Sequence, residues 1–255
     1  MVRLYRIQHV DGPRYAGERD GRWHLVNGDV FGGRGAWSLG EEIPSEGQTI
    51  LAPVQPSKIV CVGLNYKDHA AEQNKPLPAE PLLFIKPSTS VIGPGEPIQV
   101  PAWAGRVDHE AELGLVIGTR AHRVAAQDAS KYLLGLTAVN DVTARALQNK
   151  DGQYTRAKGF DTFAPIGPCI AVDLDGRDLA VRGFVNGQIR QDSRTRELIF
   201  TIPELVAFIT SIMTLLPGDI ISTGTPSGIG PIVPGDSVAV SVEGVGVLTN
   251  PVVQQ

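Results

Sequence analysis

The sequence of 255 residues has only two cysteines, Cys61 and Cys169, and both lie in apolar segments with the pattern of strands. Two cysteines cannot build a disulfide framework in a chain of this size, so we expect buried thiols. No apolar stretch approaches the roughly 20 residues that a membrane-spanning helix needs. The N-terminus also lacks the apolar core of a signal peptide, so we expect a cytoplasmic protein with no membrane partner.

Positive charge is scarce as well. The 23 basic residues are outnumbered by 27 acidic ones, and they form no basic run. A protein whose main partner is a nucleic acid usually carries a basic patch, so the net charge of −4 argues against this class. The glycine-rich segment STGTPSGIGP has neither dinucleotide-binding nor phosphate-loop spacing, so we predict a loop between strands there.

Glycine and proline are abundant, with 29 and 19 residues, and they divide the chain into short strand-like segments. Helical patterns are fewer, and no regular alternation of strands and helices is found, which makes a doubly wound parallel sheet a poor fit. The sequence therefore predicts an α+β fold that is mainly β. The helices are expected at residues 65–74, 126–134, 141–150 and 201–213.

The chain divides into a small first part and a large second part. Residues 1–50 have the pattern of hairpins, with turns at Asp20-Gly21 and Asn27-Gly28, and they are too few to form a core of their own. A segment rich in proline, serine and glutamine follows. We therefore predict a small N-terminal β extension over residues 1–50 and a main domain over residues 51–255.

Two glutamates stand at the head of a very apolar run in AGRVDHEAELGLVIG. In a strand, Glu110 and Glu112 point to the same face, where like charges need strong compensation. Ion pairs are one source of compensation and a divalent cation is another. Asp141, at the end of a predicted strand, adds a third carboxylate. Three carboxylates without cysteine or paired histidine favour Mg²⁺, Mn²⁺ or Ca²⁺ over zinc.

The segment after this aspartate supplies further polar groups. If residues 141–150 are helical, Asp141, Arg145 and Gln148 fall on one face. Asp141 could then be a helix cap, and an Asp–Arg ion pair on a solvated helix is equally common. Arg145 has the planar fork that binds a substrate carboxylate through two hydrogen bonds. Lys158, in RAKGFDTFAP, is either a surface residue or a second cation for the substrate.

A histidine and a glutamate are spaced as a proton-transfer pair. His69 and Glu72 are i,i+3 neighbours if NYKDHAAEQN is helical, so the carboxylate can orient the imidazole as a general base. Pairs with this spacing more often lie on the protein surface and have no catalytic role. The segment begins directly after a strand and a glycine, where a mobile helix could sit.

In their order along residues 58–251, these motifs resemble the fumarylacetoacetate hydrolase family. The resemblance is carried by GLNYKDHAAE, LFIKPSTS, DHEAELGLVIG, NDVTARALQ, RAKGFDTFAPIGP, VNGQIRQ and ISTGTPSGIGP. It implies a β-roll of stacked mixed sheets and, in most members, a dimer. It also implies Mg²⁺, Mn²⁺ or sometimes Ca²⁺ at Glu110, Glu112 and Asp141, a lid pair of His69 and Glu72, and substrate contacts from Arg145, Gln148, Lys158 and Thr225.

The resemblance also implies the chemistry. Family members act on 2-oxo or 2-hydroxy acids, and the metal stabilises the negative charge of an enolate. The first 50 residues resemble the extension of members that are 2-hydroxyhepta-2,4-diene-1,7-dioate isomerases. We therefore expect an isomerase or decarboxylase of such diacids in aromatic catabolism. A hydrolase of acylpyruvates, an oxaloacetate decarboxylase and a non-catalytic module that binds small acids are the alternatives.

Overall fold

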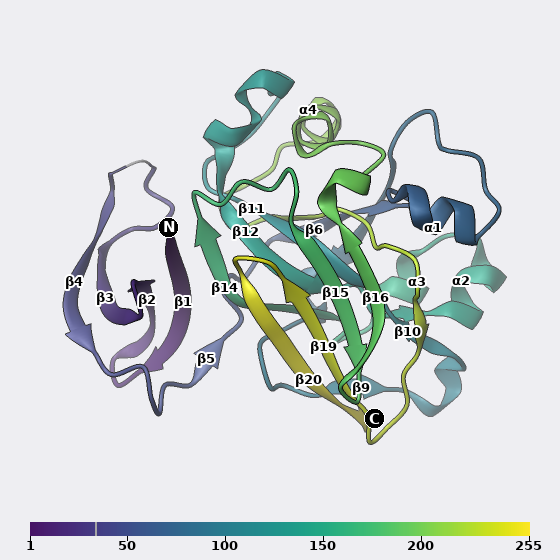
Figure 1. Cartoon of the computed structure of the whole chain (residues 1–255), viewed down its shortest axis with the longest axis horizontal. Helices are drawn as coiled ribbons and strands as arrows, with labels where there is room; N and C mark the ends of the chain where they lie inside the picture. Colours follow the sequence, from purple (N-terminus) through teal and green to yellow (C-terminus); the bar gives the residue numbers. More distant parts are fainter. Residues whose placement is uncertain (34) are drawn as a thin grey trace.

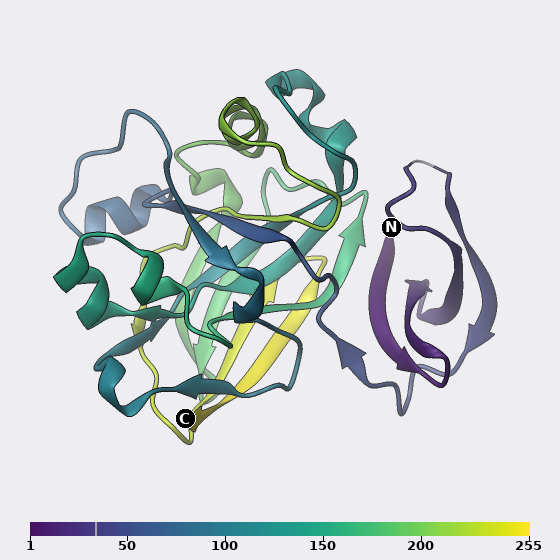
Figure 2. The same cartoon turned by 180° about the vertical axis from the view of Figure 1, so that it is seen from behind.

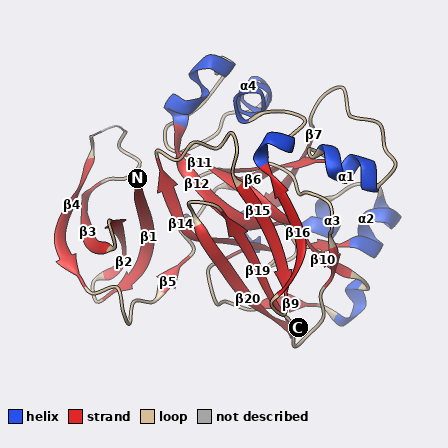
Figure 3. Cartoon of the chain, viewed as in Figure 1, coloured by secondary structure: helices blue, strands red, loops and turns tan. Residues whose placement is uncertain are grey.

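The computed structural model describes residues 1–33 and 35–255, and strands dominate this part of the chain (Figure 3). Twelve of the described strands form one sheet, in the order β4-β3-β2-β1-β14-β12-β11-β17-β6-β7, with β5 paired to β1 and β8 paired to β14. The strands of this sheet are β1 (Val2–His9), β2 (Gly12–Arg19), β3 (Arg22–Gly28), β4 (Trp37–Ile43), β5 (Ile50–Leu51), β6 (Lys58–Gly63), β7 (Leu82–Pro87), β8 (Val91–Ile92), β11 (Ala111–Ile117), β12 (Leu133–Asn140), β14 (Ala164–Val172) and β17 (Ile220–Ser222).

Two smaller sheets and a few short helices complete the described part. The three-stranded sheet contains β10 (Val107–His109), β13 (Thr143–Ala144) and β18 (Gly230–Pro231), and the five-stranded sheet contains β9 (Ile98–Val100), β15 (Ala180–Val185), β16 (Gln188–Arg194), β19 (Ser237–Val242) and β20 (Gly246–Gln254). The α-helices are α1 (Lys67–Glu72), α2 (Arg145–Asp151), α3 (Thr155–Lys158) and α4 (Ile202–Ile212). Short 3₁₀ helices are η1 (Ser88–Ser90), η2 (Ala102–Ala104), η3 (Ala126–Tyr132) and η4 (Thr195–Glu197). The predicted mainly β class is confirmed.

The N-terminal strands form an antiparallel meander that continues the large sheet through β1 and β14 (Figure 1). The predicted turn at Asp20-Gly21 joins β2 and β3, and both residues have positive φ. The second predicted turn was wrong, because Asn27 and Gly28 lie inside β3, paired with Ser38 and Trp37 of β4. The Asn-Gly pair is a turn signal only where both residues adopt positive φ, and here only Gly28 does.

The centre of the large sheet is covered on both faces. All seven residues of β11 are buried, which explains why its sequence is continuously apolar instead of alternating. Leu113, Leu115 and Ile117 pack into one hydrophobic cluster, whereas Val116 points to the opposite face and packs into another. Helix α4 adds Leu205, Val206 and Ile209 to the first cluster. No helix in the described residues is long and apolar enough to cross a membrane.

The short helices α1, α2 and α3 gather at the side of the molecule away from the N-terminal meander (Figures 1 and 2). Helix α2 contacts β10, and α3 contacts both α2 and β7. The helix predicted over residues 201–213 matches α4, whose capping box is formed by Thr201 and Glu204. The pattern over residues 126–134 gives the 3₁₀ helix η3 instead, and the chain enters β12 at Leu133.

Candidate active site

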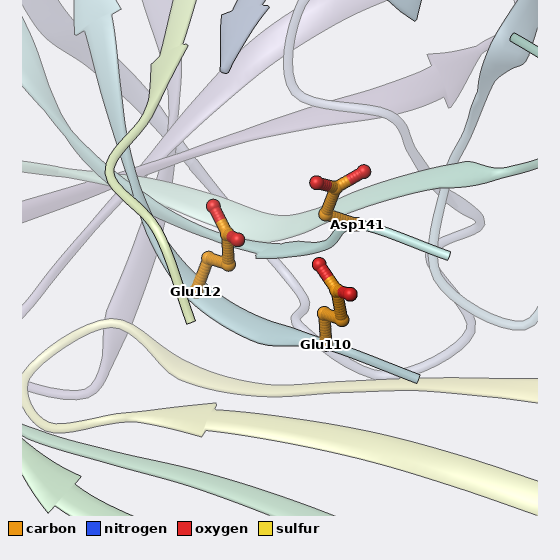
Figure 4. Close-up of side chains that lie close together, drawn as sticks. All are labelled: Glu110, Glu112 and Asp141. Atoms are coloured by element: carbon orange, nitrogen blue, oxygen red, sulfur yellow. The ribbon is translucent and has the colours of Figure 1, made fainter. Parts of the chain in front are cut away.

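The pairing of β11 with β12 brings the three predicted carboxylates together. Ala111 lies opposite Asn140 in this antiparallel pair, so Glu110, which directly precedes β11 and is not itself in a strand, and Glu112 of β11 flank Asp141, which directly follows β12. The backbone N–H of Asp141 donates to the carbonyl of Glu110 over 2.9 Å, which fixes this register. One carboxylate oxygen from each acid lies within 4.8 Å of the others, and all three side chains are buried (Figure 4).

Buried and half-buried cations compensate two of the three acids. The Lys158 ammonium donates to Glu110 Oε2 over 2.7 Å and to Asp141 Oδ2 over 2.6 Å. Arg145 forms an ion pair with the other oxygen of Glu110. Lys158 is therefore no surface residue, and its buried ammonium is paired with two carboxylates.

A second buried lysine was missed in the sequence. Lys86 of β7 is fully buried and donates to Asp141 Oδ1 over 2.6 Å and to the carbonyl of Val142 over 3.0 Å. The sequence does mark this lysine as unusual, because a lysine flanked by apolar residues in LLFIKP has to find a buried partner or a route to solvent. The sequence alone could not identify Asp141 as that partner, since the two residues are 55 positions apart.

Glu112 differs from the other two acids because it has neutral partners. The Ser222 hydroxyl donates to its Oε2 over 2.5 Å and the Gly224 N–H over 2.9 Å. Burial, followed by the charges of Asp141 and Glu110, raises the pKa of Glu112 to about 8. Burial also acts on Glu110, but the Lys158 and Arg145 cations outweigh it and lower the pKa of Glu110 to about 2. A cation bound between the three carboxylates would favour the ionised form of Glu112 and so lower its pKa.

The donor set therefore fits a hard divalent cation. Three carboxylates offer oxygen atoms only, and one of them lacks a cationic partner among the described residues. Each carboxylate oxygen can accept more than one bond, so the ion pairs to Glu110 and Asp141 do not exhaust their capacity as ligands. Oxygen ligands of this kind suit Mg²⁺, Mn²⁺ or Ca²⁺ better than zinc.

The predicted helical face of Asp141, Arg145 and Gln148 was only partly correct. Helix α2 begins at Arg145, and Ala144 is its N-cap, so Asp141 is neither helical nor a helix cap. The two residues of β13 intervene because Thr143 and Ala144 pair with β10. Arg145 still donates to Gln148, its predicted neighbour on that face, but its ion pairs are with Glu110 and, over 3.0 Å, with Asp108 instead of Asp141.

His69 and Glu72 form the predicted pair on α1. His69 Nδ1 lies 2.9 Å from Glu72 Oε2, and since a carboxylate only accepts hydrogen bonds, Nδ1 carries the proton. Nε2 is then an acceptor, and the Gln73 side-chain nitrogen lies 2.7 Å from it. The other oxygen of Glu72 accepts from the Gly228 N–H over 3.0 Å, which ties α1 to the loop after β17.

These groups meet around a single cavity of about 570 Å³. His69, the three acids, Arg145, Gln148, Lys158 and Thr225 all line it, whereas Glu72 lies behind His69 and orients it. The Thr225 hydroxyl donates to the carbonyl of Ala111 and accepts from Gln191, which holds the glycine-rich loop against β11. Leu64, Leu82, Phe84, Tyr154 and Ile229 give the cavity an apolar wall.

The comparisons with known proteins agree with this site. Residues 58–253 match the family model described as the C-terminal domain of fumarylacetoacetate (FAA) hydrolase. The chain belongs to the fumarylacetoacetate hydrolase family. A family relative, the mitochondrial oxaloacetate tautomerase of Xenopus laevis, is 40% identical over 218 residues, which cover 80% of this chain and 68% of that protein.

Solved structures of family members match nearly the whole chain. The 5-carboxymethyl-2-hydroxymuconate delta-isomerase of Mycobacterium smegmatis is 47% identical, with a TM-score of 0.91 over 99% of this chain and 100% of that one. The 2-hydroxyhepta-2,4-diene-1,7-dioate isomerase of Mycobacterium marinum is 43% identical, with a TM-score of 0.91 over 100% and 99%. The maleylpyruvate hydrolase of Sphingobium sp. SYK-6, solved with manganese(II) and pyruvate, is 30% identical, with a TM-score of 0.82 over 99% of both chains.

Proposed function

We propose that this family member is a divalent-metal-dependent enzyme acting on 2-oxo and 2-hydroxydienoate diacids, and that it isomerises or decarboxylates 2-hydroxyhepta-2,4-diene-1,7-dioate or a close analogue. The observation that carries the proposal is the convergence of three carboxylates, two cations and a histidine–glutamate pair on one cavity. The two isomerase structures support this reaction type, since both match the chain over nearly its full length at higher identity than the maleylpyruvate hydrolase.

In this proposal Glu110, Glu112 and Asp141 hold Mg²⁺ or Mn²⁺, with Ca²⁺ as a further candidate. When bound, the ion supplies positive charge to the carboxylate and the adjacent oxygen of a 2-oxo or 2-hydroxy acid. Arg145 and Lys158 line the same cavity and neutralise charge that develops on the substrate. Gln148 and Thr225 are proposed to orient the 2-oxo or 2-hydroxy acid end of the substrate.

His69 is proposed to move the proton. In the isomerisation, the 2-hydroxyl oxygen loses a proton, the double bonds shift along the chain, and C5 gains a proton, so no other reactant is needed. His69 is suited to this transfer because Nε2 has a free electron pair while Glu72 keeps the proton on Nδ1. The Gln73 amide, which lies at Nε2, has to move aside when substrate enters.

Hydrolysis of an acylpyruvate is the second candidate, favoured by the maleylpyruvate hydrolase that holds manganese(II) and pyruvate. It requires His69 to activate a water molecule instead of moving a proton within the substrate. An oxaloacetate reaction is a third candidate, supported by the tautomerase relative. A non-catalytic acid-binding module would need the carboxylates but could dispense with the His69 and Glu72 pair, whose 2.9 Å contact weighs against it.

The deciding experiment is product analysis with the purified chain and Mg²⁺. The panel contains a hydroxymuconate-type diacid, fumarylpyruvate, acetylpyruvate and oxaloacetate. Turnover of the diacid to its isomer or decarboxylation product, abolished by a chelator, is the expected result. Efficient release of pyruvate from the acylpyruvates without turnover of the diacid would make the chain a hydrolase. The homodimer implied by the family stays a prediction, which the mass in solution tests.

A further inference from the structure

The cavity has cations at two different levels. At its floor, Arg145 and Lys158 are buried or half-buried and form ion pairs with the acid triad. Lys75 also lines the cavity, but it is solvent-exposed and lies at the rim. Among the ion pairs of the described residues, none involves Lys75. Its charge is therefore free to meet a ligand.

The position of Lys75 follows from the way α1 ends. Asn74 adopts a left-handed conformation with φ of 51°, and its N–H donates to the carbonyl of Ala71. The N–H of Lys75 donates to the carbonyl of Ala70 over 3.0 Å, which completes a Schellman motif. Asparagine tolerates this conformation better than most residues with a Cβ. Lys75 is thus held at a fixed place relative to the helix that carries His69.

The wall between the two levels is apolar. Leu82 and Phe84 of β7 and Ile229 line the cavity together with the floor and the rim residues. Such a wall suits a hydrocarbon chain with a charged group at each end, because the chain loses contact with water while both ends keep ionic partners. A ligand with only one charged end would leave Lys75 without a partner.

We propose that Lys75 binds the second carboxylate of a dicarboxylic substrate and so makes the site selective for diacids. This inference rests on the proposed function, since it requires the first carboxylate to be held at the acid triad. Because Lys75 and His69 belong to one structural unit, binding of the distal carboxylate also aligns α1 with the substrate. Lys75 acts on specificity and takes no part in moving the proton.

The test compares two ligands that differ only at the distal end. Calorimetric titration of the full chain with saturating Mg²⁺ measures the affinity for 2-oxoadipate and for 2-oxohexanoate. The diacid is expected to bind about fivefold more tightly, the scale of one solvent-exposed ion pair. Lys75→Gln should abolish this preference without changing the affinity for the monoacid, and Lys75→Glu should reverse it. Lys67→Gln, an exposed lysine on α1 that does not line the cavity, is the matched control and should keep the preference.

The outcomes separate this inference from the proposed function. If wild-type protein binds both ligands equally, or if Lys75→Gln keeps the preference, the role of Lys75 is overturned while a metal-dependent acid site stands. If neither ligand binds with Mg²⁺ present, both proposals are overturned. If Lys75→Gln lost affinity for the monoacid, this would also count against the inference, because the lysine would then contact the 2-oxo acid end that both ligands share.

Discussion

The ammonium nitrogen of Lys158 lies 2.6 Å from Oδ2 of Asp141, and both side chains are buried. The same ammonium binds Glu110, so one internal cation compensates two of the three acids that are proposed to hold a metal. Burial of so many charges is tolerable only while they remain paired, since an unpaired buried charge is strongly destabilising. Lys158, Lys86 and Arg145 thus compensate Glu110 and Asp141, and a divalent cation would compensate Glu112 as well.

Replacing Lys158 with Met is expected to lower the free energy of unfolding in the absence of metal by about 3–5 kcal/mol, because Glu110 and Asp141 lose a buried partner. Denaturant unfolding in chelator and in Mg²⁺ measures the change, and Mg²⁺ should stabilise the variant more than the wild type. Lys131→Met, at an exposed pair with Asp128, is the control and should leave stability almost unchanged. Equal effects of the two substitutions would contradict the compensating role of Lys158.

The proposed metal ligands are tested most directly at Glu112, which has no cationic partner in the described ion pairs. Glu112→Gln removes the carboxylate that would bind the ion but keeps an oxygen that can accept from Ser222 and Gly224, so the fold should persist. The rise in melting temperature produced by Mg²⁺ should disappear, together with chelator-sensitive activity. Glu72→Gln, which changes a carboxylate outside the triad, should retain the Mg²⁺ effect. An unchanged metal affinity in Glu112→Gln would refute the assignment.

Metal affinity should also depend on pH through Glu112. Its pKa is raised to about 8 by burial and by its acidic neighbours, so this carboxyl is largely protonated in the metal-free protein at pH 6. A ligand has to lose its proton to bind the ion. The affinity for Mg²⁺ should therefore rise by up to about tenfold per pH unit below pH 8 and level off above it. Titrations at pH 6, 7, 8 and 9 test this, and an affinity that does not change with pH would contradict it.

Local patterns were sufficient for much of the site. The spacing of Glu110 and Glu112 predicted a shared face, and the i,i+3 spacing of His69 and Glu72 predicted a contact that the structure confirms at 2.9 Å. Both inferences use only the geometry of one element. The meeting of these two pairs in one cavity depends on how β11, β12 and α1 are placed, and the sequence indicated it only through resemblance to a family.

Contacts between distant segments explain what the sequence could not predict. Lys86 reaches Asp141 from β7, and Arg145 reaches Asp108 across α2 and β10, in pairs separated by 55 and 37 residues. The error over Asp141 has the same origin. Helical spacing alone extends α2 back to residue 141, whereas pairing of β13 with β10 keeps residues 143 and 144 in a strand. Tertiary pairing thus overrides local propensity at the point where the site is built.

Asp219 shows how a turn motif can hide a structural role. The turns Pro217-Gly218-Asp219 and Pro234-Gly235-Asp236 have the same sequence. Asp219 is fully buried and accepts from Ser57, Lys58 and Leu216, which ties β17 to the start of β6. Asp219→Asn should lower the free energy of unfolding by about 3 kcal/mol, measured with urea. Asp236→Asn, in the more exposed motif, should cost less than about 1 kcal/mol. Equal costs would contradict this distinction.

The role of His69 is tested by separating catalysis from metal binding. His69→Ala removes the only imidazole that lines the cavity in the described structure, so kcat on the substrate found by product analysis should fall by about 100-fold or more. The rise in melting temperature with Mg²⁺ should be unchanged, because His69 is not part of the acid triad. His122→Ala, at an exposed histidine, controls for the loss of an imidazole and should keep wild-type kcat. Wild-type turnover by His69→Ala would show that the contact with Glu72 is structural and that another group moves the proton.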